Sequence, residues 1–136
     1  MTFTPRRVFI GAITLLIVGA IAASIWVVGS PAEARLRILD ERRIQHLQSI
    51  EHWVALYTVA KKSLPPSLSL LSQPPIGMTI PVDPETGQPY EYRITGPRSY
   101  EVCATFSREG ERASPSYGPY AWTHVKGRQC FPRDVK

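Results

Sequence analysis

VFIGAITLLIVGAIAASIWVV, residues 8–28, decides the fold, because this stretch contains no charged side chain and its only hydroxyl groups belong to Thr14 and Ser24. As a helix that rises about 1.5 Å per residue, it spans roughly 31 Å, which matches a hydrocarbon core of about 30 Å. A segment in lipid must satisfy its backbone hydrogen bonds internally, and a helix does so. The stretch therefore predicts a transmembrane helix over residues 8–28, with the lipid bilayer as its partner.

The flanking charges bear on orientation. Residues 1–7 contain Arg6 and Arg7 and no acid, which favours a cytoplasmic tail. Four arginines between residues 35 and 43 follow the span, and a count of basic residues alone favours the opposite topology. The cysteines described below favour a single-pass protein of the bacterial cytoplasmic (inner) membrane with its C-terminal domain in the periplasm.

Cleavage is the alternative to a permanent anchor. Ala32-Glu33-Ala34 has the small-x-small form of a signal-peptidase site. However, the apolar stretch is longer than the roughly 7–15 residues of a cleaved signal, and the region around Ala34 has the features of a helix start. We therefore expect the anchor to remain.

The remainder, about 106 residues from Pro31 onward, is enough for one domain with one core. Twelve of the 13 prolines lie at or after Pro31, a density that an all-helical domain does not tolerate. The net charge is +5, and +3 once Arg6 and Arg7 are removed, with no run of Lys or Arg longer than two residues. A nucleic-acid partner is not expected from this pattern.

Residues 29–62 predict an amphipathic helix. Ser30 is a candidate N-cap, Pro31 suits the first helical position, and Glu33 completes a capping box. One apolar stripe with spacings close to three and four follows, and it consists of Leu36, Leu39, Ile44, Leu47, Ile50, Val54 and Tyr57.

The rest of the domain predicts irregular structure and a small sheet. Residues 63–88 are Pro-rich, with one helical turn expected over 67–71 and a turn over 83–87. Residues 89–136 predict strands over 89–95 and 99–106 joined as a hairpin, then a polar loop over 107–121 and a third strand over 128–132. The fold class is α+β: an apolar helix, a long amphipathic helix and an antiparallel sheet of about three strands.

Cys103 and Cys130 lie on the second and third predicted strands. If these strands are neighbours, the two cysteines can form a disulfide, which closes a loop of about 27 residues and contributes roughly 3–4 kcal/mol. A disulfide implies an oxidising compartment, whereas two free thiols would imply a domain that faces the cytoplasm.

No catalytic, cofactor or metal site is expected. His46, His52 and His124 do not have the short spacings of a zinc site. Asp83 and Glu85 are interpreted as turn formers, and we predict that the protein is not an enzyme. The candidate interaction surface is aromatic, and it consists of Tyr90 and Tyr92 on the hairpin with Tyr117 and Tyr120 in the loop.

Several short stretches carry a resemblance to a known family: Tyr57, Leu64-Pro65, Leu68, Asp83-Pro84, Tyr90-Glu91-Tyr92-Arg93 and Tyr100-Glu101-Val102-Cys103-Ala104. Together with the order of elements, they resemble type II secretion major pseudopilins and type IV pilins. They also resemble uncharacterised bacterial single-pass membrane proteins, in which residues 122–131 would form a signature. The resemblance implies a pilin-like domain behind the membrane helix.

The chain departs from the pilin pattern in its leader and in its loop. Gly11 is followed by Ala12 rather than by an aromatic residue or Met, and Leu16 stands where pilins have Glu. The loop of residues 107–121 contains no Asp, so a pseudopilin calcium loop is not recognisable. The expected function is a non-enzymatic envelope protein that acts through contacts with an unidentified protein or with itself. A pseudopilin-like filament or secretion-system subunit is one alternative, and a cytoplasm-facing domain with free thiols is another.

Overall fold

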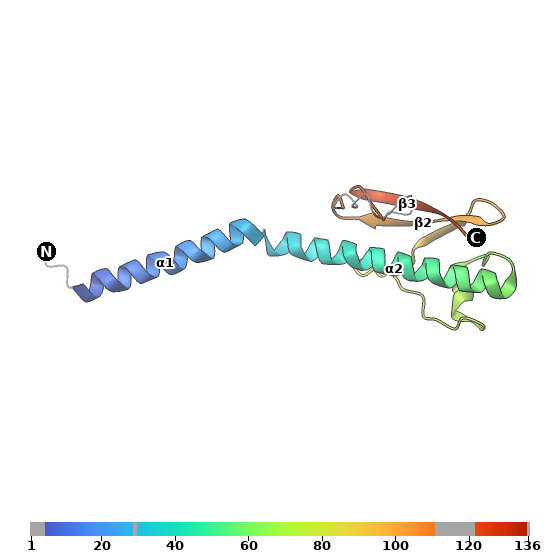
Figure 1. Cartoon of the computed structure of the whole chain (residues 1–136), viewed down its shortest axis with the longest axis horizontal. Coiled ribbons are helices and arrows are strands. Elements are labelled where there is room, and N and C mark those ends of the chain that lie inside the picture. The colour runs from blue at the N-terminus through green and yellow to red at the C-terminus, as the bar shows by residue number, and fades with distance from the viewer. Residues whose placement is uncertain (1–4, 29, 111–121, 136) are drawn as a thin grey trace. The chain divides into compact units, whose positions relative to one another are not determined.

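The computed structural model describes residues 5–28, 30–110 and 122–135, and the chain divides into one unit up to Arg35 and a second from Leu36 onward (Figure 1). The predicted α+β class is confirmed. The elements are two helices, α1 (Pro5–Val28) and α2 (Pro31–Lys61), a 3-10 helix, η1 (Leu68–Ser72), and three strands, β1 (Glu91–Ile94), β2 (Ser99–Phe106) and β3 (Gly127–Asp134).

The first helix, α1, is long and apolar enough to span a membrane over Pro5–Ser24, and none of that span is buried by other parts of the described chain. Trp26, near its C-terminal end, is 92% exposed. The helix begins at Pro5, three residues before the start of the predicted helix over residues 8–28. Proline suits this position because the first turn of a helix needs no backbone donor.

The second helix, α2, begins where its capping residues predict. The Ser30 Oγ accepts a hydrogen bond from the backbone N–H of Glu33 at 3.3 Å, and Pro31 is the first helical residue. The helix ends at Lys61, because Lys62 adopts a left-handed conformation with φ of 59°. The bounds therefore differ from the predicted 29–62 by two residues at the start and by one at the end.

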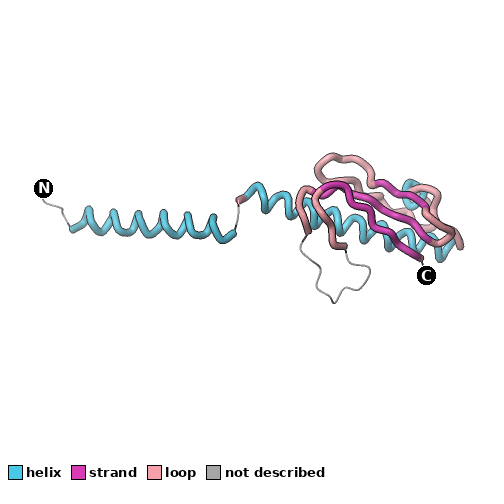
Figure 2. Tube along the Cα trace, turned by 90° about the horizontal axis from the view of Figure 1, so that it is seen from above, coloured by secondary structure: helices cyan, strands magenta, loops and turns pink. Residues whose placement is uncertain are grey.

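The sheet is antiparallel, with the order β1-β2-β3, and its strands are drawn in magenta in Figure 2. The central strand β2 has the predicted bounds, and its side chains at positions 100, 102, 104 and 106 are buried, as their alternation predicts. β1 is shorter than the predicted 89–95, because Pro89 has no N–H to donate and forms an isolated bridge with Val82 instead. β3 extends beyond the predicted 128–132 at both ends.

Two backbone hydrogen bonds fix which groups of the central strand face each neighbour. Thr95 N–H donates to Ser99 O, and Val135 N–H donates to Arg98 O, both at 2.9 Å. Since the pattern alternates along an antiparallel ladder, the odd-numbered backbone groups of β2 face β1 and the even-numbered groups face β3. Pro132 agrees with this assignment, because it lies opposite Glu101 at a position where β3 donates nothing to β2.

The sheet packs on α2, with the Pro-rich segment completing the core. The expected helical turn over 67–71 is present as η1, and the expected turn over 83–87 is closed by the Gly87 N–H, which donates to Asp83 O at 2.8 Å. The buried apolar residues form one cluster: Leu47, Ile50, Val54, Leu64, Leu68, Leu71, Tyr90, Tyr100, Val102, Ala104, Phe106 and Phe131.

Candidate functional site

The most constrained group in the domain is Arg43, which is 2% exposed on the buried face of α2. Its five N–H donors make five hydrogen bonds. Two go to Asp83, at 2.6 and 3.2 Å, and the other three go to Asp40 at 2.7 Å, Ser107 Oγ at 3.0 Å and Glu85 at 2.6 Å. Burial alone would lower the pKa of Arg43, but its bonds to the three carboxylates raise it.

Asp40 extends this cluster to the segment that follows β2. Its carboxylate oxygens accept the backbone N–H groups of Ser107 at 3.0 Å and Arg108 at 2.9 Å. A buried carboxylate with several donors is satisfied as a charged group. The Arg43 cluster, defined as Asp40, Arg43, Asp83, Glu85 and Ser107, therefore joins α2, the turn before β1 and the end of β2.

Asp83 has both of the roles that an aspartate at a turn can take. Its Oδ1 accepts the backbone N–H groups of Glu85 at 3.0 Å and Thr86 at 2.9 Å, as expected of a turn former. Burial by itself raises the pKa of Asp83, but the hydrogen bonds from Arg43 and from the turn lower it to about 2. The interpretation of Asp83 and Glu85 as turn formers was therefore incomplete, since both also bind Arg43.

The Arg43 cluster was missed by the sequence analysis, although a signal for it exists. The buried positions of α2 are Asp40, Arg43, Leu47, Ile50 and Val54, which follow one another at spacings of four and three. In this part of the helix, the predicted apolar stripe instead ran through Leu36, Leu39 and Ile44, which are only partly buried. Two opposite charges spaced three apart on the core face of a helix indicate a buried ion pair, and this spacing could have revealed the cluster.

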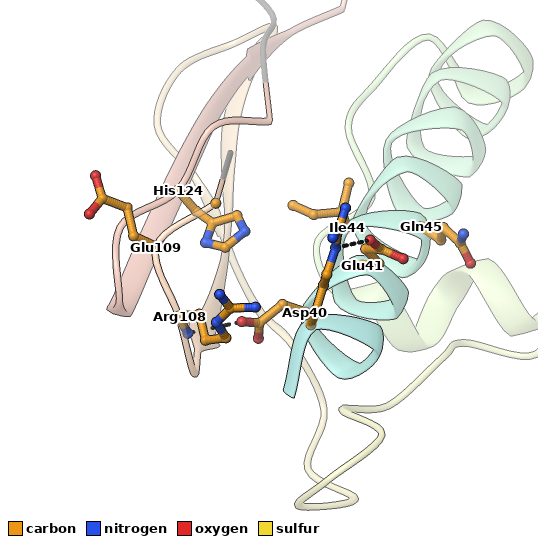
Figure 3. A pocket seen from close by; sticks show the side chains of 9 residues that line it. Asp40, Glu41, Ile44, Gln45, Arg108, Glu109 and His124 are labelled. Carbon is orange, nitrogen blue, oxygen red and sulfur yellow. Dashed lines mark hydrogen bonds and ion pairs between the residues drawn. The ribbon is translucent and has the colours of Figure 1, made fainter. Parts of the chain in front are cut away.

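A cleft of about 380 Å³ lies between the N-terminal part of the domain's helix and the segments that flank the loop (Figure 3). Its lining includes Arg37, Glu41 and Ile44 from α2, with Arg108 and His124 opposite. Arg37 and Glu41 form an ion pair at 3.1 Å on the exposed side of the helix. The cleft thus presents both signs of charge around one apolar side chain.

His124 forms one wall of this cleft through packing. Its ring stacks on Phe106 with 3.7 Å between the ring centroids, and its backbone carbonyl accepts the N–H of Gly110 at 2.9 Å. A Cβ atom at Gly110 would come within 2.7 Å of the imidazole, so a larger residue there would have to displace the ring. His124 therefore holds together the two segments on either side of the loop.

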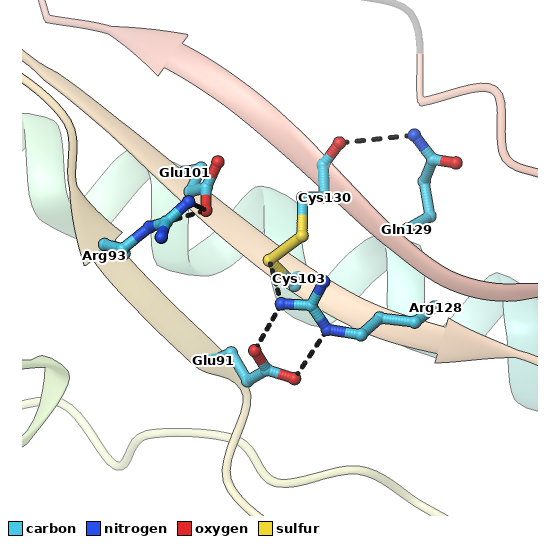
Figure 4. The surroundings of a disulfide bond; sticks show 7 residues. All are labelled: Glu91, Arg93, Glu101, Cys103, Arg128, Gln129 and Cys130. Carbon is cyan, nitrogen blue, oxygen red and sulfur yellow. Dashed lines mark hydrogen bonds and ion pairs between the residues drawn. A yellow bond between two sulfur atoms is a disulfide. The ribbon is translucent and has the colours of Figure 1, made fainter.

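The predicted disulfide between Cys103 and Cys130 is present, and these residues lie directly opposite each other in the β2–β3 register (Figure 4). Both side chains lie on the face of the sheet that points away from α2. Arg128 Nη2 lies 3.6 Å from Cys103 Sγ and 2.6 Å from a carboxylate oxygen of Glu91. Cys103 is buried although it lies on the outer face, because the long side chains of Arg128 and Glu91 lie over its sulfur atom.

The outer face of the sheet is otherwise ionic. Arg93 pairs with Glu101 across β1 and β2 at 2.7 Å, beside the Glu91–Arg128 pair at 2.6 Å. Glu101, Cys103 and Cys130 are the one group of potential metal ligands that the described residues bring together. Both sulfurs belong to the disulfide, so this group is not available to a metal ion.

The expected aromatic surface needs correction. Tyr90 is 6% exposed and belongs to the core, and its hydroxyl lies 2.9 Å from His46 Nδ1. Tyr92 is partly buried against Tyr100, and burial raises the pKa of Tyr92 to about 12. Aromatic side chains of this size are drawn into the small core, which leaves them little surface for a partner. Tyr117 and Tyr120 lie outside the described residues.

A second buried cation, Arg133, was also missed. It lies 4.0 Å from the ring of Trp122 and 3.3 Å from a carboxylate oxygen of Glu51 on α2. Position 133 alternates with the buried Phe131, and this alternation places it on the core face of β3.

Comparison of the chain with known protein families, with curated proteins and with solved structures finds no match. The function proposed below therefore rests on the structure of this chain. Within residues 5–28, 30–110 and 122–135, the buried charge interactions hold chain segments together, whereas the exposed features are the apolar α1 and the outer face of the sheet.

We predict that Arg43→Gln strongly destabilises the domain, because it leaves three carboxylates without their shared cation. The expected loss is about 3–5 kcal/mol in the free energy of unfolding, measured by urea titration of the full chain in mild detergent. Arg42→Gln, which changes the exposed neighbour, is the matched control and should cost no more than about 0.5 kcal/mol. Equal effects of the two substitutions would contradict the structural role of Arg43.

The low pKa of Asp83 predicts acid sensitivity. Its pKa is about 2 in the folded chain, below the ordinary 3.8, so the unfolded chain binds this proton more readily. The resulting stability is present above about pH 4 and is lost as the pH falls toward about 2, by roughly 2 kcal/mol. Urea titrations across this range should show a smaller decline for Asp83→Asn, and an unchanged decline would refute this assignment.

Proposed function

We propose that the chain is a non-enzymatic, single-pass membrane protein of the bacterial envelope, whose disulfide-bonded domain acts through protein contacts in the periplasm. The observation that supports a membrane anchor is helix α1. Its span of 20 residues, Pro5–Ser24, is not buried by any other part of the described chain. Exposing such a surface to water is costly, at about 25 cal/mol for each Å² of apolar area. A bilayer removes this cost, and the helix satisfies its own backbone hydrogen bonds there.

The disulfide supports the periplasmic side. Cys103 and Cys130 form a bond that persists in oxidising compartments and is rare in the bacterial cytoplasm. It closes the long connection between β2 and β3, so a reducing compartment would loosen that part of the domain. The four arginines that follow the span do not support this orientation, and for that reason topology needs a direct test.

Protein contact is the activity that the domain's surface supports best. Its best-formed charge cluster is internal and saturated, since every donor of Arg43 is used within the domain. The outer face of the sheet carries paired charges rather than a nucleophile beside a base. The contact partner is either another envelope protein or a second copy of the chain.

Carbonate extraction of cell membranes tests the anchor. The full chain should remain in the pellet, whereas Leu15→Arg/Leu16→Arg should shift it toward the aqueous fraction, because each central charge costs about 3 kcal/mol in the bilayer. The matched control is Leu56→Arg, at an exposed leucine of α2, which should leave the chain in the pellet. A wild-type chain in the aqueous fraction would end this proposal.

A periplasm-active reporter fused after Lys136 tests the side of the membrane in the same strains. Reporter activity together with absence of free thiols is the expected result. An inactive reporter together with two free thiols would favour the alternative of a domain facing the cytoplasm.

The second candidate function is a subunit of a pilin-like filament. The observation that favours it is an apolar helix followed in sequence by a long helix that packs on a small antiparallel sheet. Assembly by the usual route requires removal of a leader, but Gly11-Ala12 and Leu16 do not fit the processing pattern of the family. Mass measurement of the mature chain decides this point, because an intact N-terminus that retains Met1 would exclude this route.

A further inference from the structure

A groove of about 310 Å³ lies at the end of the domain where α2 ends. The last turn of α2, the turn between β1 and β2 and the end of β3 meet at this end of the domain (Figures 1 and 2). The hairpin turn is held to the end of the sheet, since Val135 N–H donates to Arg98 O at 2.9 Å. The lining includes Val59, Lys62 and Ser63 on the helix side, with Pro97, Arg98 and Val135 on the sheet side.

The groove carries two cations that the domain does not neutralise. The side chains of Lys62 and Arg98 are exposed, and neither has a hydrogen bond or an ion pair within the described chain. Asp134, next to Val135 in sequence, lies on the outer face of the sheet, where its carboxylate accepts a bond from Ser99 Oγ at 2.6 Å. The end of α2 adds a partial negative charge of only about half a unit. The groove therefore attracts an anionic group.

Lys62 occupies its position at a cost to the backbone. Its φ of 59° makes it the one non-glycine residue with a positive φ in the part of the chain that the structure describes. Glycine is preferred directly after a helix in this conformation, because a β-carbon is crowded there. The lysine side chain makes no polar contact within the described chain that would offset this cost. A side chain held in this way without an internal partner points to an external one.

We propose that this groove, named the Lys62–Arg98 groove, binds an acidic segment of another protein. This inference rests on the proposed protein-contact function and names the chemistry of the partner. One carboxylate of the segment binds the two cations, and the Ser63 hydroxyl is a further donor for it. A neighbouring apolar side chain of the segment packs on Val59, which is 65% exposed.

The form of the site favours a peptide over a lipid surface. A recess of about 310 Å³ has room for a short peptide segment, whereas a layer of headgroups contacts cations that protrude. A second copy of this chain is a poorer match, because most of its carboxylates are already bound. Among the described acidic residues, only the carboxylates of Glu33 and Glu109 have no hydrogen bond or ion pair.

Binding of end-blocked tetrapeptides to the full chain in mild non-ionic detergent tests the groove. The acidic probe is acetyl-Leu-Asp-Glu-Leu-amide, and the matched neutral probe is acetyl-Leu-Asn-Gln-Leu-amide. In NMR titrations, the amide signals of the groove should shift with the acidic probe alone. Lys62→Gln and Arg98→Gln should each weaken binding by about threefold, and together by about tenfold, because each removes one partly exposed charge pair. Lys126→Gln, at an exposed lysine outside the groove, is the matched control and should leave binding unchanged.

Two further variants separate binding from folding. Lys62→Glu/Arg98→Glu should lose the acidic probe and bind acetyl-Leu-Lys-Arg-Leu-amide instead, which also shows that this variant is folded. Lys62→Gly should weaken binding of the acidic probe by about threefold while it raises the urea midpoint by roughly 0.5 M, because glycine adopts the left-handed conformation without crowding. A lysine that serves only to end the helix would give no loss of binding.

Equal binding of the acidic and neutral probes overturns the proposal, and so does binding that the Lys62 and Arg98 variants leave unchanged. Groove signals that shift in nanodiscs containing phosphatidylglycerol, and not with the acidic probe, would assign the groove to the membrane surface and also overturn it. Association of two tagged copies that depends on Lys62 and Arg98 would overturn it in favour of a second copy. The carbonate test of the anchor does not involve this groove, so its outcome is separate from each of these results.

Discussion

The guanidinium group of Arg43 is the constraint on which the rest of the domain depends. It lies on the buried face of α2 and binds Asp83 and Glu85 before β1 and Ser107 after β2. A buried charge is tolerated only where its donors are satisfied, and all five donors of Arg43 are. The turn, the end of the central strand and the helix must therefore come together in one arrangement for the core to close.

Around that point the sheet has two faces and two edges with different chemistry. The inner face is mainly apolar, with Arg133 buried among its residues, and it covers α2, whereas the outer face holds the disulfide beneath charged pairs. At the β3 edge Pro132 has no N–H to donate and two backbone carbonyls accept side-chain hydrogen bonds, whereas at the β1 edge Val82 bridges Pro89 just before the strand.

The parts of the fold that could be predicted from sequence are those that depend on local patterns. β2 matched its predicted bounds because an apolar residue recurs at every second position from 100 to 106, and α2 began at its capping residues. Cys103 and Cys130 were paired correctly because a hairpin followed by a third strand has few antiparallel arrangements. The candidate surface was less successful, since Tyr90 proved to be a core residue.

By itself, the sequence determined the apolar span, the long helix, the hairpin and the cysteine pair, because periodicity and composition act over a few neighbouring residues. Only the tertiary structure decided which charges are buried and which groups cover each edge of the sheet. Arg43 meets Asp83 across 40 residues and Ser107 across 64, so its burial depends on where the folded chain brings distant acceptors. The same holds for the β3 edge, since Pro132 and Gln129 block it only because β3 pairs with β2 in one register.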